Sequence, residues 1–266
     1  MDTLRILVIS DLHECQANLD MLIQELKGKN YDKLFICGDF MNLSKEQCLD
    51  PDMKNQSIKH INEVIDQLRT GFQLGKDSII IIPGNHDHNE FFINCDALNP
   101  LNIHKRSIHI AEGLFVVGQG GAVPGYDIAT GEIAFDGFPY NNEEEYYKDL
   151  QDVLELEKEI SKTSQFIHMS HTGPSMSSTS IIEEGDGKPL KSGSDSLNTL
   201  LKERRDKMLF LVHGHSHYGL GIFNYIDTRV INPGSLRYNG SYGEIVLKSV
   251  QQEWKVKSST IGYFKL

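Results

Sequence analysis

The amino-acid sequence predicts an α/β protein in which two sheets pack between helices. Three observations point to this fold class. Strand-like and helix-like segments alternate between residues 5 and 83, the strand-like segments are almost wholly apolar, and shorter strands follow after residue 100. Alternation of this kind is typical of parallel strands whose sheet is covered by helices. The chain has 266 residues, and we expect a single domain over residues 1–266.

The first part of the chain has the pattern of a βαβαβ unit. Buried strands are expected at residues 5–10, 33–38 and 78–83. Amphipathic helices are expected at 18–28 and 58–69, where apolar residues recur at helical spacing. The polar segment 41–57 contains Pro51 and is expected to be a loop.

The second part of the chain has more numerous strands. Two of them should flank a turn at Glu112-Gly113, within residues 107–118. The other strands are expected at 165–170 and 208–214, and as short antiparallel strands of the tail at 229–235, 243–250 and 253–259. Helices are expected at 143–161 and 197–204, and loops at 118–132 and 172–192, of which the second is expected to be mobile.

Five of the predicted strands lead directly into residues that can bind metal ions. These segments are Asp-Leu-His at 11–13, Gly-Asp at 38–39, Gly-Asn-His-Asp at 84–87, Ser-His at 170–171 and Gly-His-Ser-His at 214–217. In open α/β sheets, ligands bind at the carboxyl ends of the strands. We therefore expect the five segments to meet at one edge. Oxygen and imidazole ligands of this kind suit zinc, manganese, iron or nickel.

The number of candidate ligands indicates more than one metal ion. The candidates are Asp11, His13, Asp39, Asn85, His171, His215 and His217. One ion needs three or four ligands, so this set fits two ions with one bridging carboxylate, an arrangement that can clamp a phosphoryl group. Each segment alone also has a structural interpretation, such as a helix N-cap at Asp11 or a turn at Asp39. The specific signal is the ordered set.

This ordered set resembles the signature of the calcineurin-like metallophosphoesterases over residues 11–217. The resemblance implies a four-layer α/β/β/α sandwich with a dinuclear centre of divalent or mixed-valence manganese, iron or zinc. The implied ligands of the first ion are Asp11, His13 and His217, and those of the second are Asn85, His171 and His215, with Asp39 as the bridge.

The resemblance also implies the reaction. A phosphomonoester or phosphodiester would be hydrolysed by a metal-bound hydroxide. His86 would be the catalytic histidine beside the scissile phosphate, and Asp87 would orient its imidazole. Many members of the family have Glu where this chain has Asp87, but no ligand position is lost, so an active enzyme is expected.

Composition narrows the choice of partners and compartment. The formal net charge is −11, which disfavours nucleic acid as a partner, and no apolar stretch reaches membrane-spanning length. The four cysteines form no Cys-x-x-Cys pair and indicate reduced thiols in a cytoplasmic protein. The expected substrate is a phosphorylated small molecule or a phosphoprotein. The alternatives are a nuclease of the same family and a metal-bearing interaction module, and the oligomeric state stays open.

Three further residues near these segments have no assigned role. His88 is interpreted as a solvated loop histidine, and His213 is unassigned. Arg237 follows the Asn-Pro-Gly-Ser segment and could face either substrate or solvent.

Overall fold

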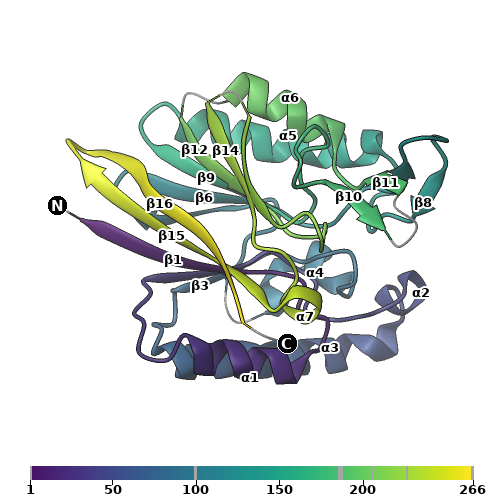
Figure 1. The fold of residues 1–266 in the computed structure, drawn as a ribbon, viewed down its shortest axis with the longest axis horizontal. Helices are drawn as coiled ribbons and strands as arrows, with labels where there is room; N and C mark the ends of the chain where they lie inside the picture. Colours follow the sequence, from purple (N-terminus) through teal and green to yellow (C-terminus); the bar gives the residue numbers. More distant parts are fainter. Residues whose placement is uncertain (1, 99–100, 185–187, 205–206, 226, 265–266) are drawn as a thin grey trace.

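The computed structural model describes residues 2–98, 101–184, 188–204, 207–225 and 227–264. Two six-stranded sheets face each other, and each is covered on its outer face by helices. Figure 1 shows the four layers, with α1 and α3 on one outer side and α5 and α6 on the other. The four-layer α/β/β/α sandwich predicted by the resemblance is therefore confirmed.

The first sheet contains the strands of the βαβαβ unit. Its order is β16 (Glu253–Tyr263), β15 (Ser241–Val250), β1 (Thr3–Ile9), β2 (Lys33–Ile36), β3 (Ile79–Ile81) and β4 (Leu101–Asn102). Strands β1 to β4 run parallel, as predicted for the first three of them, and β15 and β16 add an antiparallel pair at the other edge. The parallel strands bring their carboxyl ends to one edge of the sheet.

The second sheet has a parallel centre with an antiparallel strand at each edge. Its order is β13 (Gly221–Tyr225), β14 (Thr228–Asn232), β12 (Met208–Val212), β9 (Gln165–Ser170), β6 (Leu114–Gln119) and β5 (Ser107–Ala111). The turn predicted at Glu112-Gly113 joins β5 to β6. Strand β14 runs antiparallel to β13 but parallel to β12, so the prediction of an antiparallel strand there is right on one side only. Strands β15 and β16 are long, not short.

A third, smaller sheet is built mostly from segments that were expected to be loops. Its order is β10 (Ile181–Glu184), β11 (Lys188–Lys191), β7 (Gly125–Asp127) and β8 (Ile133–Phe135). The loop predictions for 118–132 and 172–192 are therefore wrong in part, and residues 185–187 lie outside the described residues. Figure 1 shows this sheet at one end of the molecule.

The helices cover the outer faces of the two large sheets. They are α1 (Gln16–Glu25) and α3 (Pro51–Phe72) on the first sheet, and α5 (Glu143–Ile160) and α6 (Asp195–Arg204) on the second. Short helices are α2 (Lys45–Cys48), α4 (Glu90–Ile93), the 3₁₀ helix Cys95–Ala97 and α7 (Leu236–Asn239). No described helix is both long enough and apolar enough to cross a membrane.

The apolar runs of the strands follow from burial on both faces. In β1, Leu7 and Ile9 pack against the helices, whereas Ile6 and Val8 pack into the core between the two sheets. Full burial of such a side chain contributes about 1.5–3 kcal/mol. The buried sheets therefore hold the segments that follow their strands in fixed positions.

The segment 41–57, predicted to be a loop, is helical at α2 and from Pro51 onward. Pro51 is the first residue of α3, where a missing backbone N–H costs nothing and the fixed φ angle favours the helix. The carboxylate of Asp50 caps this helix by accepting a hydrogen bond from the Asp52 backbone N–H at 3.0 Å. Proline here begins a helix instead of excluding one.

Candidate metal centre

The five polar segments lie at the carboxyl ends of parallel strands from both large sheets. Asp11, Asp39 and Asn85 follow β1, β2 and β3 of the first sheet. His171 follows β9 of the second sheet, and the segment of His215 and His217 follows β12. Backbone hydrogen bonds join these segments directly, from Asp11 N to Gly38 O at 3.0 Å and from Gly214 N to His171 O at 3.0 Å.

Unusual backbone conformations gather in these segments. Positive φ angles occur at Asp11 (55°), His13 (43°), Glu14 (59°), Asp39 (56°) and His215 (66°). Residues with a Cβ atom rarely adopt this left-handed region, and such strain is found where function demands a fixed side-chain direction. The fold thus holds these side chains in directions that a relaxed loop would not favour.

Four of the candidate ligands form one compact group. The ligand atoms of Asp11, His13, Asp39 and His217 all lie within 4.8 Å of one another. His217 Nε2 lies 3.1 Å from His13 Nε2 and 3.2 Å from Asp11 Oδ1. His13 Nε2 lies 3.7 Å from Asp39 Oδ2. This group contains the three residues assigned to the first ion together with the bridging candidate.

The other three candidates lie beside the same carboxylate. His171 Nε2 is 2.9 Å from Asn85 Oδ1 and 3.3 Å from Asp39 Oδ2. The ring centroids of His171 and His215 are 5.2 Å apart. Asp39 is therefore close to both groups, which is the position that a bridging ligand requires.

The donor atoms in this site fit metal ions. Asp39 Oδ2 and His215 Nε2 are buried without a hydrogen-bond partner of good geometry among the described residues. Buried polar atoms are rarely left in that state, so these two point to a missing partner. His13 Nδ1 lies 3.2 Å from the Met41 carbonyl and His171 Nδ1 lies 2.6 Å from the Cys37 carbonyl. A proton at Nδ1 leaves Nε2 as the ligand atom.

The electrostatics favour positive charge in this site. Burial disfavours the ionised form of Asp39, but the neighbouring histidines, His171 first among them, together outweigh burial and hold the pKa of the carboxyl well below its usual range. Burial likewise opposes protonation of His171, yet the carboxylate of Asp39 raises the pKa of this histidine to about 9. Burial lowers the pKa of His215 to about 3. Bound metal ions would take the place of the proton that the carboxylate of Asp39 holds on His171.

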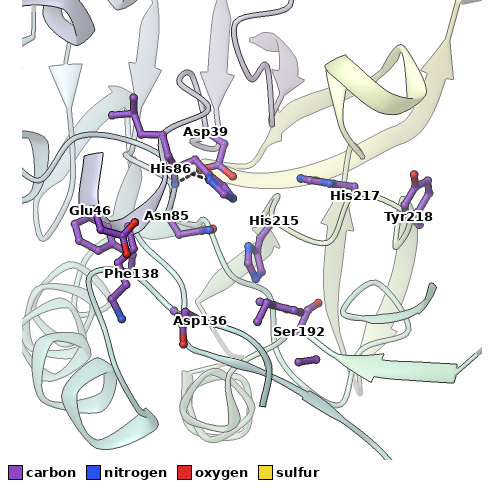
Figure 2. A pocket seen from close by; sticks show the side chains of 15 residues that line it. Asp39, Glu46, Asn85, His86, Asp136, Phe138, Ser192, His215, His217 and Tyr218 are labelled. Atoms are coloured by element: carbon purple, nitrogen blue, oxygen red, sulfur yellow. Dashed lines mark hydrogen bonds between the residues drawn. The ribbon is translucent and has the colours of Figure 1, made fainter. Parts of the chain in front are cut away.

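His86 is oriented by a backbone carbonyl. Its Nδ1 lies 2.8 Å from the carbonyl oxygen of Leu43, and its backbone N–H donates to Asp39 Oδ1 at 2.8 Å. Figure 2 shows His86 beside Asp39, with Asn85, His215 and His217 around the same space. Because Nδ1 is engaged, Nε2 is the ring atom that remains for a substrate.

The structure gives Asp87 a role that the sequence did not predict. Its carboxylate is buried and accepts hydrogen bonds from the backbone N–H groups of Gly84 (2.7 Å), Asp39 (2.9 Å) and Met41 (2.9 Å). None of its hydrogen bonds among the described residues involves the His86 ring, so the predicted orienting role has no direct hydrogen bond behind it and stays a prediction. Burial and the charge of Asp39 raise the pKa of Asp87 to about 7.

Two histidines near the site are structural. His88, which was interpreted as solvated, is buried, and its Nε2 lies 3.0 Å from the carbonyl of Asp50. His213 is also buried and its Nε2 lies 2.7 Å from Thr179 Oγ1. Neither ring contributes to the group of candidate ligands.

The sequence did not reveal that the segment after β14 contacts two of the candidate ligands. Arg237 Nη1 donates to the carbonyl of His13 at 2.6 Å, and its guanidinium lies 5.4 Å from the ring centroid of Tyr238. The Tyr238 ring is 4.8 Å from that of His217. The Asn-Pro-Gly-Ser segment was the available signal, but it does not reveal which way the following side chains point.

A cavity of about 480 Å³ opens above these groups. Asp39, Asn85, His86, His215 and His217 lie at its floor. The cavity thus contains two groups of candidate ligands, with the buried carboxylate of Asp39 between them and His86 facing the same space. This arrangement is suited to binding and cleaving a phosphoester.

Comparison with known proteins agrees with this geometry. The family model described as calcineurin-like phosphoesterase matches residues 4–219. The chain belongs to the calcineurin-like phosphoesterase family. A relative in this comparison is an uncharacterised protein of Methanocaldococcus jannaschii, 25% identical over 236 residues that make up 88% of this chain and 90% of that protein.

Solved structures share the fold at low sequence identity. The protein TT1561 of Thermus thermophilus has a TM-score of 0.58 at 17% identity, with 96% of this chain and 98% of that chain covered. A dimetal phosphatase of Danio rerio has a TM-score of 0.56 at 11% identity, with 97% and 98% covered. Phosphopantetheinyl hydrolase of Mycobacterium tuberculosis has a TM-score of 0.56 at 16% identity, with 87% and 90% covered. These likenesses support the phosphoesterase fold.

Proposed function

We propose that this member of the calcineurin-like phosphoesterase family hydrolyses a phosphomonoester or phosphodiester at a two-metal centre. The observation that carries the proposal is the position of Asp39 between two groups of candidate ligands, with His86 at the same cavity floor. Bound there, two divalent cations would neutralise the phosphoryl oxygens and lower the pKa of a coordinated water.

Side chains of the protein would supply the proton transfer and the orientation that the cations do not. His86 Nε2 can donate a proton to the leaving oxygen or stabilise the charge that develops on it. The Leu43 carbonyl fixes the ring direction through Nδ1. Asp39 and Asn85 are buried and face the cavity, and this burial strengthens their electrostatic interactions with an anionic group and its counter-ions.

The proposed substrate is a phosphorylated small molecule or a phosphoprotein. The net charge of −11 makes cations in the site necessary for attracting an anion and disfavours a nucleic-acid strand. The dimetal phosphatase of Danio rerio, which shares the fold, supports a two-metal phosphatase activity. All four cysteines are free, which supports the proposed cytoplasmic location.

The first test is hydrolysis of p-nitrophenyl phosphate and bis-p-nitrophenyl phosphate by the manganese-loaded protein. We expect turnover of at least one compound. His86→Ala should lower kcat about 10²- to 10⁴-fold and keep the metal content, because it removes only proton transfer. Asp39→Asn should lower both turnover and metal content.

Two outcomes would contradict the proposal. Undiminished hydrolysis and metal content in Asp39→Asn would exclude the proposed bridging role. Two bound metal ions without turnover of either ester would favour the interaction-module alternative instead.

A further inference from the structure

Part of the cavity wall is apolar, although its floor is polar. Leu43 and Phe138 are buried and line it, and Phe135 of β8 is half-buried and lines it as well. Figure 2 shows Glu46 and Phe138 on one side of the cavity and Tyr218 on the other. A phosphoryl group held at the floor would place the organic part of its ester against these walls.

Phe135 is held in a fixed position by two contacts. Its ring lies against the backbone of its strand partner Gly125, where an added Cβ atom would approach the ring to 2.0 Å. The same ring lies edge-on to His215, with centroids 5.5 Å apart and an interplanar angle of 64°. The small third sheet thus places an aromatic ring directly beside a candidate metal ligand.

The charged residues at the rim of the cavity limit the number of phosphoryl groups that the substrate can carry. Lys45 is the one lysine or arginine among the described residues that line the cavity, and its Nζ already donates to Asn141 Oδ1 at 3.1 Å. Glu46 and Asp136 line the same cavity as carboxylates. A second phosphoryl group outside the floor would therefore meet more negative than positive charge.

We propose that Phe135 determines substrate specificity and that the substrate carries one phosphoryl group on an aromatic or other planar apolar alcohol. This inference rests on the proposed phosphoesterase function. An aromatic leaving group can pair with the Phe135 ring in an offset or edge-on arrangement, which an alkyl group cannot do. The acidic rim selects against polyphosphates and nucleic-acid strands.

The test compares the binding of two uncleavable ligands, phenylphosphonate and methylphosphonate, to the manganese-loaded protein by isothermal titration calorimetry. The wild type should bind phenylphosphonate more tightly. Phe135→Leu keeps an apolar side chain but removes the ring, and should weaken phenylphosphonate binding about 2- to 12-fold, the loss expected for one aromatic pair. Methylphosphonate binding should change less than about twofold, and Phe135→Tyr should restore the preference.

The matched control removes an aromatic ring from the same small sheet. Tyr126 of β7 does not line the cavity, so Tyr126→Leu should leave both affinities unchanged. The inference is overturned if the wild type does not prefer phenylphosphonate, or if Phe135→Leu weakens both ligands equally. Because binding is measured without turnover, an enzyme that cleaves esters but shows no such preference refutes this inference alone. A protein that shows the preference but cleaves no ester refutes the proposed function alone.

Discussion

At the scale of single residues, Asp87 shows how one buried carboxylate can assemble a site without contacting substrate. It accepts hydrogen bonds from three backbone N–H groups that belong to the segments after β2 and β3. One of these is the N–H of Asp39, the candidate bridging ligand. The carboxylate therefore fixes the distance between the two segments that carry Asp39, Asn85 and His86.

This role predicts a loss of stability on replacement by the amide. Asp87→Asn keeps the shape but exchanges one acceptor oxygen for a donor, so at least one buried N–H loses its partner. The free energy of unfolding should fall by about 1–3 kcal/mol, measured by urea denaturation in the presence of a chelator. Asp2→Asn, which changes an exposed side chain, is the control and should have no effect. Unchanged stability with a shifted pH profile of kcat would instead support an action of Asp87 on His86.

The sequence revealed the identity of the site residues better than their partners. Asp11, His13, Asp39 and His217 were predicted as ligands from their places after strands, and the structure brings them together. The hydrogen-bond partners of Asp87 could not be predicted from the sequence. A carboxylate next to a histidine in the sequence can accept a hydrogen bond from the imidazole or from backbone N–H groups. Which of these it does depends on three-dimensional contacts between segments 46 or more residues apart.

At the scale of elements, His104 joins the two large sheets near the site. It follows β4 of the first sheet, and its Nδ1 accepts a hydrogen bond from the backbone N–H of Gly120 after β6 at 3.0 Å. The ring is buried and lies edge-on to Phe92 at 5.2 Å. Burial and the nearby Lys105 lower the pKa of His104 to about 3.

This burial predicts a specific dependence of stability on pH. In the unfolded chain, histidine titrates near its ordinary pKa of about 6.5, so acid protonates the unfolded state first. The contribution of neutral His104 is fully present above that pH and is lost as pH falls toward about 3. His104→Asn keeps an acceptor but cannot titrate. The stability advantage of the wild type over this variant should shrink by about 2 kcal/mol between pH 7 and pH 5, measured by urea denaturation. A difference that is independent of pH would refute the assignment.

Sequence patterns predicted the helices and strands whose own burial gives them a regular spacing or a run of apolar residues. Strand β9 was predicted with its observed bounds, and α5 within one residue. The hairpin of β10 and β11 was missed because it pairs with β7, which lies more than 50 residues earlier in the chain. Such long-range pairing leaves no regular pattern in a segment rich in Ser, Gly and Thr.

At the scale of the whole molecule, two layers of sheet converge on one cavity. The core between the sheets contains residues of β1, β2 and β3 from the first sheet and of β6, β9 and β12 from the second. Both sheets therefore hold their strand ends in fixed relative positions, and neither sheet alone carries all the candidate ligands. The third sheet adds the wall that carries Phe135.

The most direct test of the two-metal centre is the number and position of metal ions in crystals of the manganese-loaded protein, located by anomalous scattering. We expect two ions per chain, both within coordination distance of Asp39, one beside His13 and His217 and the other beside His171 and His215. A single ion, or ions that do not contact Asp39, would contradict the proposed two-metal centre.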